Sequence, residues 1–281
     1  MTDAGKKADE GAGESKMEIR LLEKKDNKLS FICKGITPAY ANTLRRVMLN
    51  RAPVLAIEDV EFKKNSSALY DEQLAHRLGL VPLTTDLKSY EFKSRCKCKG
   101  AGCAKCELKL TLKAKGPSTV LASALKSQDP KVKPAYPDIP LVKLLKGQEV
   151  EFTATAVLGE GREHIKWSPG LTHYKYKPEI KVSAKCDKCE KCIEACPVRV
   201  FEKSGSKIKI NQDNYLKCTL CNACVEACPK HAVSVTYDRN SFVFYVESWG
   251  QLKCKDIVKQ GVERLNTILD EFTSEVKSTL K

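Results

Sequence analysis

Residues 186–197 read CDKCEKCIEACP, and residues 218–229 repeat the pattern as CTLCNACVEACP. In each stretch two residues lie between the first and second cysteines, and two between the second and third. Three residues then precede the fourth cysteine, and a proline follows it directly. This C-x2-C-x2-C-x3-C-P spacing is typical of loops that hold [4Fe–4S] clusters through cysteine thiolates. The doubled motif therefore predicts an iron–sulfur domain over residues 181–235, built from two equivalent halves.

The fourth cysteine of each motif has a special role in the two-cluster bacterial pattern, where it binds the cluster of the other motif. Carried over to this chain, that exchange gives each cluster four cysteines. Cluster one takes Cys186, Cys189, Cys192 and Cys228, and cluster two takes Cys218, Cys221, Cys224 and Cys196. Zinc or disulfides at these positions are the alternatives. Exchanged ligands would lock the two halves of the domain together.

A third group of cysteines has a different spacing and consists of Cys96, Cys98, Cys103 and Cys106. Four thiolates so close in sequence can close a tetrahedral zinc site that has no open position. The KGAG turn at residues 99–102 is flexible enough to let the two pairs face each other. We expect a structural zinc; an intermittently empty loop and a third iron–sulfur centre are the alternatives.

Length and composition limit the protein class. A chain of 281 residues is long enough for two or three domains. The formal net charge is +14, but its lysines are scattered along the chain, so we favour a solvated surface over direct contact with nucleic acid. Residues 1–16 predict a disordered tail without the apolar core of a signal peptide. No apolar run is long enough to span a membrane, and clustered cysteines favour metal binding in the reducing cytoplasm.

The remaining residues alternate between strand and helix patterns. Residues 17–33 predict a hairpin with one buried face, on which Met17, Ile19 and Leu21 lie. Thr37 and Pro38 suit the start of a helix that Pro53 would block. A short helix is expected from residue 71 to Gly79. Strands are expected at residues 54–62, 107–113 and 149–159, and at 232–237 and 241–250 around a turn, DRN.

The last stretch predicts a helix of about 25 residues, which is longer than a typical globular helix. Its apolar residues follow an a/d register and are Val258, Val262, Leu265, Leu269, Phe272 and Val276. A narrow apolar seam of this kind needs a covering surface, either the chain's own sheet or a second chain.

Catalytic patterns are missing from the sequence. It contains no G-x-G-x-x-G and no P-loop, and its four histidines form no catalytic grouping, so we expect no catalytic residues. Two classes of function remain: a non-catalytic assembly subunit, or an electron carrier or oxidoreductase subunit of the bacterial ferredoxin type.

Residues 41–86 decide between them, together with the segments NTLRRVML, VLAIEDV, DEQLAHRLGLVPL, HIKWSPG and FVFYVESWG. They closely resemble the assembly subunits of cellular RNA polymerase. That family contains the N-terminal domain of the bacterial alpha subunit, the third-largest subunit of eukaryotic polymerase II and the archaeal counterpart of both. The resemblance extends from about residue 17 to the C-terminus, except for the iron–sulfur insertion, which points to the archaeal branch.

The resemblance implies an α+β fold with three parts. Residues 17–51 and 236–281 would form a discontinuous dimerisation domain, residues 52–180 a β-rich insert with the zinc-type loop, and residues 181–235 a ferredoxin-like domain.

The resemblance also implies a non-catalytic role in DNA-directed RNA polymerase, a nucleotidyltransferase. The seam would pair with a small homologous subunit, L, and the dimer would carry the large catalytic subunits, with DNA contacted only through the assembled enzyme. Arg45 and Arg46 match a position that docks a large subunit. The clusters would stabilise their domain and tune assembly.

Overall fold

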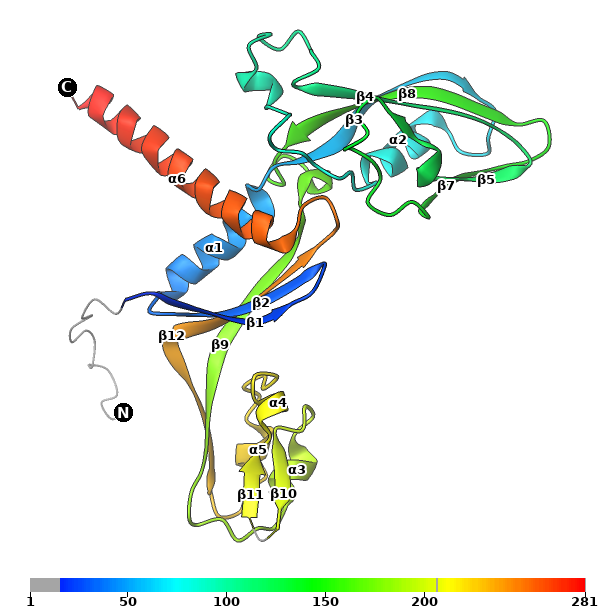
Figure 1. Ribbon diagram of the computed structural model, residues 1–281. Helices are drawn as coiled ribbons and strands as arrows, with labels where there is room; N and C mark the ends of the chain where they lie inside the picture. Colours follow the sequence, from blue (N-terminus) through cyan, green and yellow to red (C-terminus); the bar gives the residue numbers. More distant parts are fainter. Residues whose placement is uncertain (1–15, 206, 281) are drawn as a thin grey trace, which may run out of the picture. The chain divides into compact units, whose positions relative to one another are not determined.

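The computed structural model describes residues 16–205 and 207–280 (Figure 1). The predicted N-terminal tail, apart from Lys16, lies outside these residues. The chain divides into two compact units that interleave in sequence. Of the described residues, the first contains those up to Leu22, Ser30–Ala41 and those of Tyr174–Phe244, and the second contains Glu23–Leu29, Asn42–His173 and those from Tyr245 onward. The domain boundaries given above stay predictions.

A four-stranded sheet supplies much of the first unit. Its strand order is β1-β2-β12-β9, with the bounds β1 Glu18–Lys24, β2 Lys28–Lys34, β9 Gly170–Val182 and β12 Val233–Ser248. Phe31 stacks on Phe244 with 5.2 Å between ring centroids, and Tyr174 meets Phe242 edge-on at 5.5 Å. Aromatic packing of this kind anchors the centre of the sheet.

The prediction of one buried face on the hairpin is wrong for its first strand. Phe31 and Cys33 on β2 are buried, whereas Met17, Ile19 and Leu21 on or beside β1 are each more than half exposed. The reason is the position of β1 at the edge of the sheet, where alternation defines two faces but does not supply an element to cover either.

The prediction of two strands around DRN is also wrong, because β12 runs without interruption through residues 238–240. The carbonyl of Asn240 accepts hydrogen bonds from the backbone N–H groups of Gly35 and Ile36, at 2.8 and 3.3 Å. The segment is therefore a paired part of a long strand, and its polar side chains reflect exposure to solvent.

The polypeptide between β9 and β12 forms a small cysteine-rich body within the first unit (Figure 1). It contains an antiparallel hairpin, β10 Phe201–Ser204 with β11 Lys207–Ile210, and three short helices: α3 Lys191–Ala195, α4 Gln212–Tyr215 and α5 Ala223–Glu226. Four cysteines are buried here with Ile180, Val200, Phe201 and Val233. The sulfur atoms are thus part of the core.

The second unit contains a β-rich body whose main sheet has the order β3-β8-β4-β6. The strands are β3 Val54–Asn65, β8 Glu149–Gly159, β4 Glu107–Lys115 and β6 Lys126–Ser127, with a second pair formed by β5 Ser118–Leu121 and β7 Pro140–Leu144. Along β8 every second residue is buried, as in Val150, Phe152 and Ala154. The core also includes Leu74 and Leu78 of α2 Asp71–Gly79. Three strand predictions and the short-helix prediction are confirmed here.

Two long helices complete the described chain. α1 spans Pro38–Asn50, and the hydroxyl of Thr37 accepts a hydrogen bond from the backbone N–H of Tyr40 at 3.2 Å, as expected of a helix cap. α6 spans Cys254–Thr279 and approaches α1 closely: a Cβ placed on Gly261 would lie 3.1 Å from the Cα of Met48. None of the helices in the described residues is long and apolar enough to cross a membrane.

Candidate metal centres and partner surface

The quartet Cys96, Cys98, Cys103 and Cys106 forms a compact sulfur cluster in the second unit. The Sγ–Sγ distances are 3.5 Å for Cys96–Cys103, 3.6 Å for Cys98–Cys106 and 3.8 Å for Cys103–Cys106. A tetrahedral zinc site with bonds of about 2.3 Å has sulfurs ~3.8 Å apart. The arrangement fits one small ion and leaves no room for an iron–sulfur cube among the sulfurs.

The loop around the quartet depends on glycine. Gly100 and Gly102 have φ angles of 86° and 91°, which place both in the left-handed region. A Cβ on Gly102 would also lie 2.4 Å from a carboxylate oxygen of Glu107. The predicted KGAG turn therefore bends where the positive φ angles would strain any other residue, and it brings the two cysteine pairs together.

The thiols of the quartet differ in acidity. Burial opposes ionisation of Cys98, but hydrogen bonds from the Cys96 thiol and from the backbone N–H groups of Gly102 and Gly100 lower its pKa to about 6. Burial raises the pKa of Cys106 to about 12, and hydrogen bonding to neighbouring thiols adds to the shift. One negative charge is stabilised and further ionisation is resisted, so a bound cation would be needed to ionise all four thiols.

Cysteines of the two motifs influence one another electrostatically, in the pattern expected for exchanged sets. Burial raises the pKa of Cys192, and charge on Cys186, Cys189 and Cys228 raises it further. Cys224 behaves in the same way: burial raises its pKa to about 11, with further contributions from Cys196, Cys218 and Cys221. The pKa of the third cysteine in each motif is thus raised by three other cysteines, one of which belongs to the other motif.

The two motifs also share backbone geometry. The sulfur of Cys196 accepts a hydrogen bond from the N–H of Val200 at 3.3 Å, and the sulfur of Cys228 accepts one from Ala232 at 3.2 Å. Left-handed φ angles recur at equivalent positions, in the pairs Lys188 and Leu220, Glu190 and Asn222, and Arg199 and His231. Hydrogen bonds to sulfur stabilise its negative charge and tune an attached cluster.

Apolar side chains enclose the second set of cysteines. A small cavity is lined by Cys196, Cys218, Cys221 and Cys224 together with Ile180, Val200 and Val235. The ammonium of Lys175 donates a hydrogen bond to the carbonyl of Cys218 at 3.1 Å. Thiolate donors, sulfur-directed N–H groups and apolar walls are what an iron–sulfur cluster requires, so the residues fit the group. Cys189 and Cys221, the second cysteines of the two motifs, are exposed.

The predicted seam on α6 is incompletely covered within the described chain. The residues that α6 buries are Cys254, Ile257 and Gly261, which form a neighbouring stripe. Val258, Val262 and Leu265 are half-buried beside that stripe, while Leu269 is 52% exposed, Phe272 63% and Val276 37%. The C-terminal half of α6 therefore presents large apolar side chains to solvent.

The two arginines of α1 differ in exposure, and Arg45 is half-buried. The guanidinium of Arg45 donates two hydrogen bonds, at 3.1 and 2.9 Å, to the side-chain oxygen of Asn42 on the same helix. Arg46 is exposed. Their use by a partner stays a prediction.

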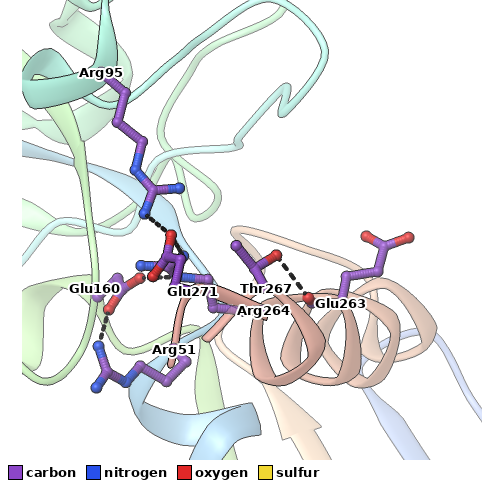
Figure 2. Close-up of polar contacts among 7 residues, drawn as sticks. All are labelled: Arg51, Arg95, Glu160, Glu263, Arg264, Thr267 and Glu271. Atoms are coloured by element: carbon purple, nitrogen blue, oxygen red, sulfur yellow. Dashed lines mark hydrogen bonds and ion pairs between the residues drawn. The ribbon is translucent and has the colours of Figure 1, made fainter. Parts of the chain in front are cut away.

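Sequence reasoning missed a group of charged residues around Glu160, which Figure 2 shows. The carboxylate of Glu160 lies between the guanidinium groups of Arg51 and Arg264, and Glu271 lies beside Arg95. No motif joins these residues, because the contacts connect distant segments of a chain with many charges.

Comparisons with known proteins agree with both parts of the architecture. Residues 60–173 match the family described as the RNA polymerase Rpb3/RpoA insert domain, and residues 185–233 match the 4Fe-4S dicluster domain. The chain is 43% identical to DNA-directed RNA polymerase subunit Rpo3 of Archaeoglobus fulgidus, over 91% of this chain and 96% of the relative. It is 44% identical to the protein of the same name from Methanothermobacter thermautotrophicus, over 89% of this chain and 95% of the relative. Its identity to the one from Pyrococcus horikoshii is 36%, over 93% of this chain and 98% of the relative.

Proposed function

Because the chain belongs to the Rpo3 family of DNA-directed RNA polymerase subunits, we propose that it is a non-catalytic assembly subunit of that enzyme. The observation that carries the proposal is identity with Rpo3 proteins over nearly the whole of both chains, including an Rpb3/RpoA insert domain. Its free cysteines suit the reducing cytoplasm.

The proposed partners are other polymerase subunits. The small homologous subunit L binds the seam on α6, which has exposed apolar residues at Leu269 and Phe272. Large subunits dock near Arg45 and Arg46, and DNA is contacted only through the assembled enzyme. Exposed apolar side chains along one side of a long helix support this role, because such surfaces favour a protein partner.

The iron–sulfur domain is proposed to hold two [4Fe–4S] clusters, with the exchanged cysteine sets as ligands. When bound, the clusters supply strong iron–thiolate bonds that cross-link the two motifs, so binding free energy becomes folding free energy. The chain's own residues position and shield the sulfurs through the Val200 and Ala232 N–H groups and the apolar walls. The role is a structural one that tunes assembly.

The quartet at residues 96–106 is proposed to hold a structural zinc. Sγ–Sγ distances close to those of a zinc tetrahedron support this assignment.

Zinc affinity is expected to increase with pH. Zinc binds thiolates, so the protons on Cys96 and Cys106, whose pKa values are raised, must leave when the metal binds. With at least these two protons released, apparent binding strengthens at least about 100-fold between pH 7 and 8. Below pH about 6, Cys98 also binds a proton and the dependence becomes steeper. Competition with a chelator of known pH-dependent affinity measures the apparent zinc affinity at each pH. Cys254→Ser, which lies outside the quartet, is the control. Equal zinc affinity at pH 7 and pH 8 would contradict the expectation.

The proposed function is tested by anaerobic co-expression of the full chain with candidate polymerase subunits, followed by native mass and metal analysis of the complex. We expect a stoichiometric complex with the small subunit, about eight iron atoms per chain, and no substrate turnover by the chain alone. A chain that binds no polymerase subunit but exchanges electrons rapidly with a soluble donor would instead be an electron carrier.

A further inference from the structure

Helix α6 has one side that packs on its own chain and another that carries the seam. Charged residues continue the packed side toward the C-terminal end of the helix. The buried stripe of Cys254, Ile257 and Gly261 continues at helical spacing to Arg264 and Glu271. The exposed residues Leu269 and Phe272 lie on this same C-terminal part of the helix. Beyond the contact of Gly261 with Met48, ion pairs therefore contribute to setting the direction in which the seam faces.

Glu160 is the centre of these ion pairs. It is only 5% exposed, and its two carboxylate oxygens bind two different segments. One oxygen accepts a hydrogen bond from Nε of Arg264 on α6 at 2.7 Å, and the other accepts one from Nη1 of Arg51, directly after α1, at 2.7 Å (Figure 2). The carboxylate is thus a bridge between the end of one helix and the middle of the other.

The position of Glu160 is fixed by its neighbours in sequence. A Cβ on Gly159 would lie 2.4 Å from the ring of Trp167, and one on Gly161 would lie 2.6 Å from the carbonyl oxygen of Leu49. The N–H of Glu163 also donates to the carbonyl of Glu160 at 2.9 Å. Since both flanking residues lie in tight contacts at the end of β8, the carboxylate is a rigid reference point for α6.

A second ion pair lies further along the helix. Nη2 of Arg95 is 2.9 Å from the carboxylate of Glu271, and Nη1 of Arg264 is 3.8 Å from the same group (Figure 2). Arg95 and Glu271 are about half exposed, so their pair contributes little stability by itself. The buried bridge through Glu160 is therefore the contact expected to determine the rotation of α6.

We infer that Glu160 is a positioning residue for partner binding: its bridge to Arg264 holds α6 in the rotation that presents Leu269 and Phe272 to the small subunit. The inference rests on the proposed function. A rotation by one residue position turns the seam by about 100°, so a small loss of register moves these side chains away from a partner. Glu160 acts through Arg264 and does not belong to the seam.

The test is Glu160→Gln in the full chain, prepared anaerobically, with the association and dissociation rates of the small subunit measured separately. The variant keeps the side chain's shape but removes the buried carboxylate that binds Arg264, which keeps only the exposed Glu271 at 3.8 Å. We expect binding at least tenfold weaker, with the loss in the association rate, because fewer molecules hold α6 in the competent rotation. Dissociation is expected to stay within twofold, since Glu160 does not contact the partner.

Glu263→Gln is the matched control, because Glu263 is an exposed acid beside Arg264 that pairs with Lys259 on the same helix. It is expected to bind as the original chain does. If Glu160→Gln does not fold, the association and dissociation rates of the small subunit are measured with Arg264→Gln instead. That variant removes the α6 side of the bridge and keeps the Arg51–Glu160 pair. Unchanged binding, or a loss confined to the dissociation rate, overturns the inference alone. Failure of the original chain to bind the small subunit overturns the proposed function and this inference with it.

Discussion

Phe272→Asp is expected to weaken binding of the small subunit by roughly 150-fold, which corresponds to about 3 kcal/mol. Phe272 is 63% exposed in the isolated chain, so its ring is available to be buried against a partner. Removing that burial and placing a carboxylate in an apolar contact both oppose association. The free energy of unfolding of the isolated chain is expected to stay nearly unchanged, because the side chain packs little on its own chain.

Ser274→Asp is the matched control for this variant. It adds the same charge two residues away on α6, at an exposed position outside the seam. Titration calorimetry with the purified small subunit measures both variants, and thermal unfolding measures their stability. If Phe272→Asp and Ser274→Asp bind equally well, the seam is not the partner surface.

Cys186→Ser or Cys221→Ser is expected to remove one cluster and leave about four of about eight iron atoms per chain. Since the cluster contributes folding free energy, its loss unfolds residues 181–235 locally. Large subunits are then expected to associate more weakly, whereas pairing with the small subunit is expected to stay unchanged, because the seam belongs to the other compact unit. Iron analysis, limited proteolysis and pull-down with each partner measure these effects.

Cys33→Ser is the control for the cluster variants, because Cys33 is a buried cysteine of β2 outside the doubled motif. It is expected to keep the full iron content. A variant that loses the small subunit while it still docks the large subunits would contradict the proposed division between cluster domain and seam.

Local patterns were sufficient to predict much of this fold. The alternation of Val150, Phe152 and Ala154 identifies β8 because one side of that strand faces a core. The cap at Thr37 identifies the start of α1, and the spacing of the cysteines identifies the iron–sulfur loops. In each case neighbours within a few residues determine the structure, so a single sequence contains the necessary information.

Other features depend on residues far apart, and there the sequence was not sufficient. Alternation at Ile19 and Leu21 defines two faces of β1 but does not say which of them is covered. The polar segment DRN has the composition of a turn, although it belongs to an exposed part of a long strand. Glu160 and Arg264 are 104 positions apart, and 49 basic and 35 acidic residues allow too many possible pairs for composition to select this one.

The proposed exchange of cysteines between the two motifs would have a consequence for biosynthesis. A ribosome that makes this chain releases Cys186, Cys189 and Cys192 well before Cys228, which lies with them in one set. With the proposed ligand sets, cluster one would lack its fourth cysteine until the second motif has emerged, and cluster two, which would take Cys196, would be completed over the same stretch. Under this proposal, iron and sulfide would be delivered late in translation or after release, when both motifs are in place.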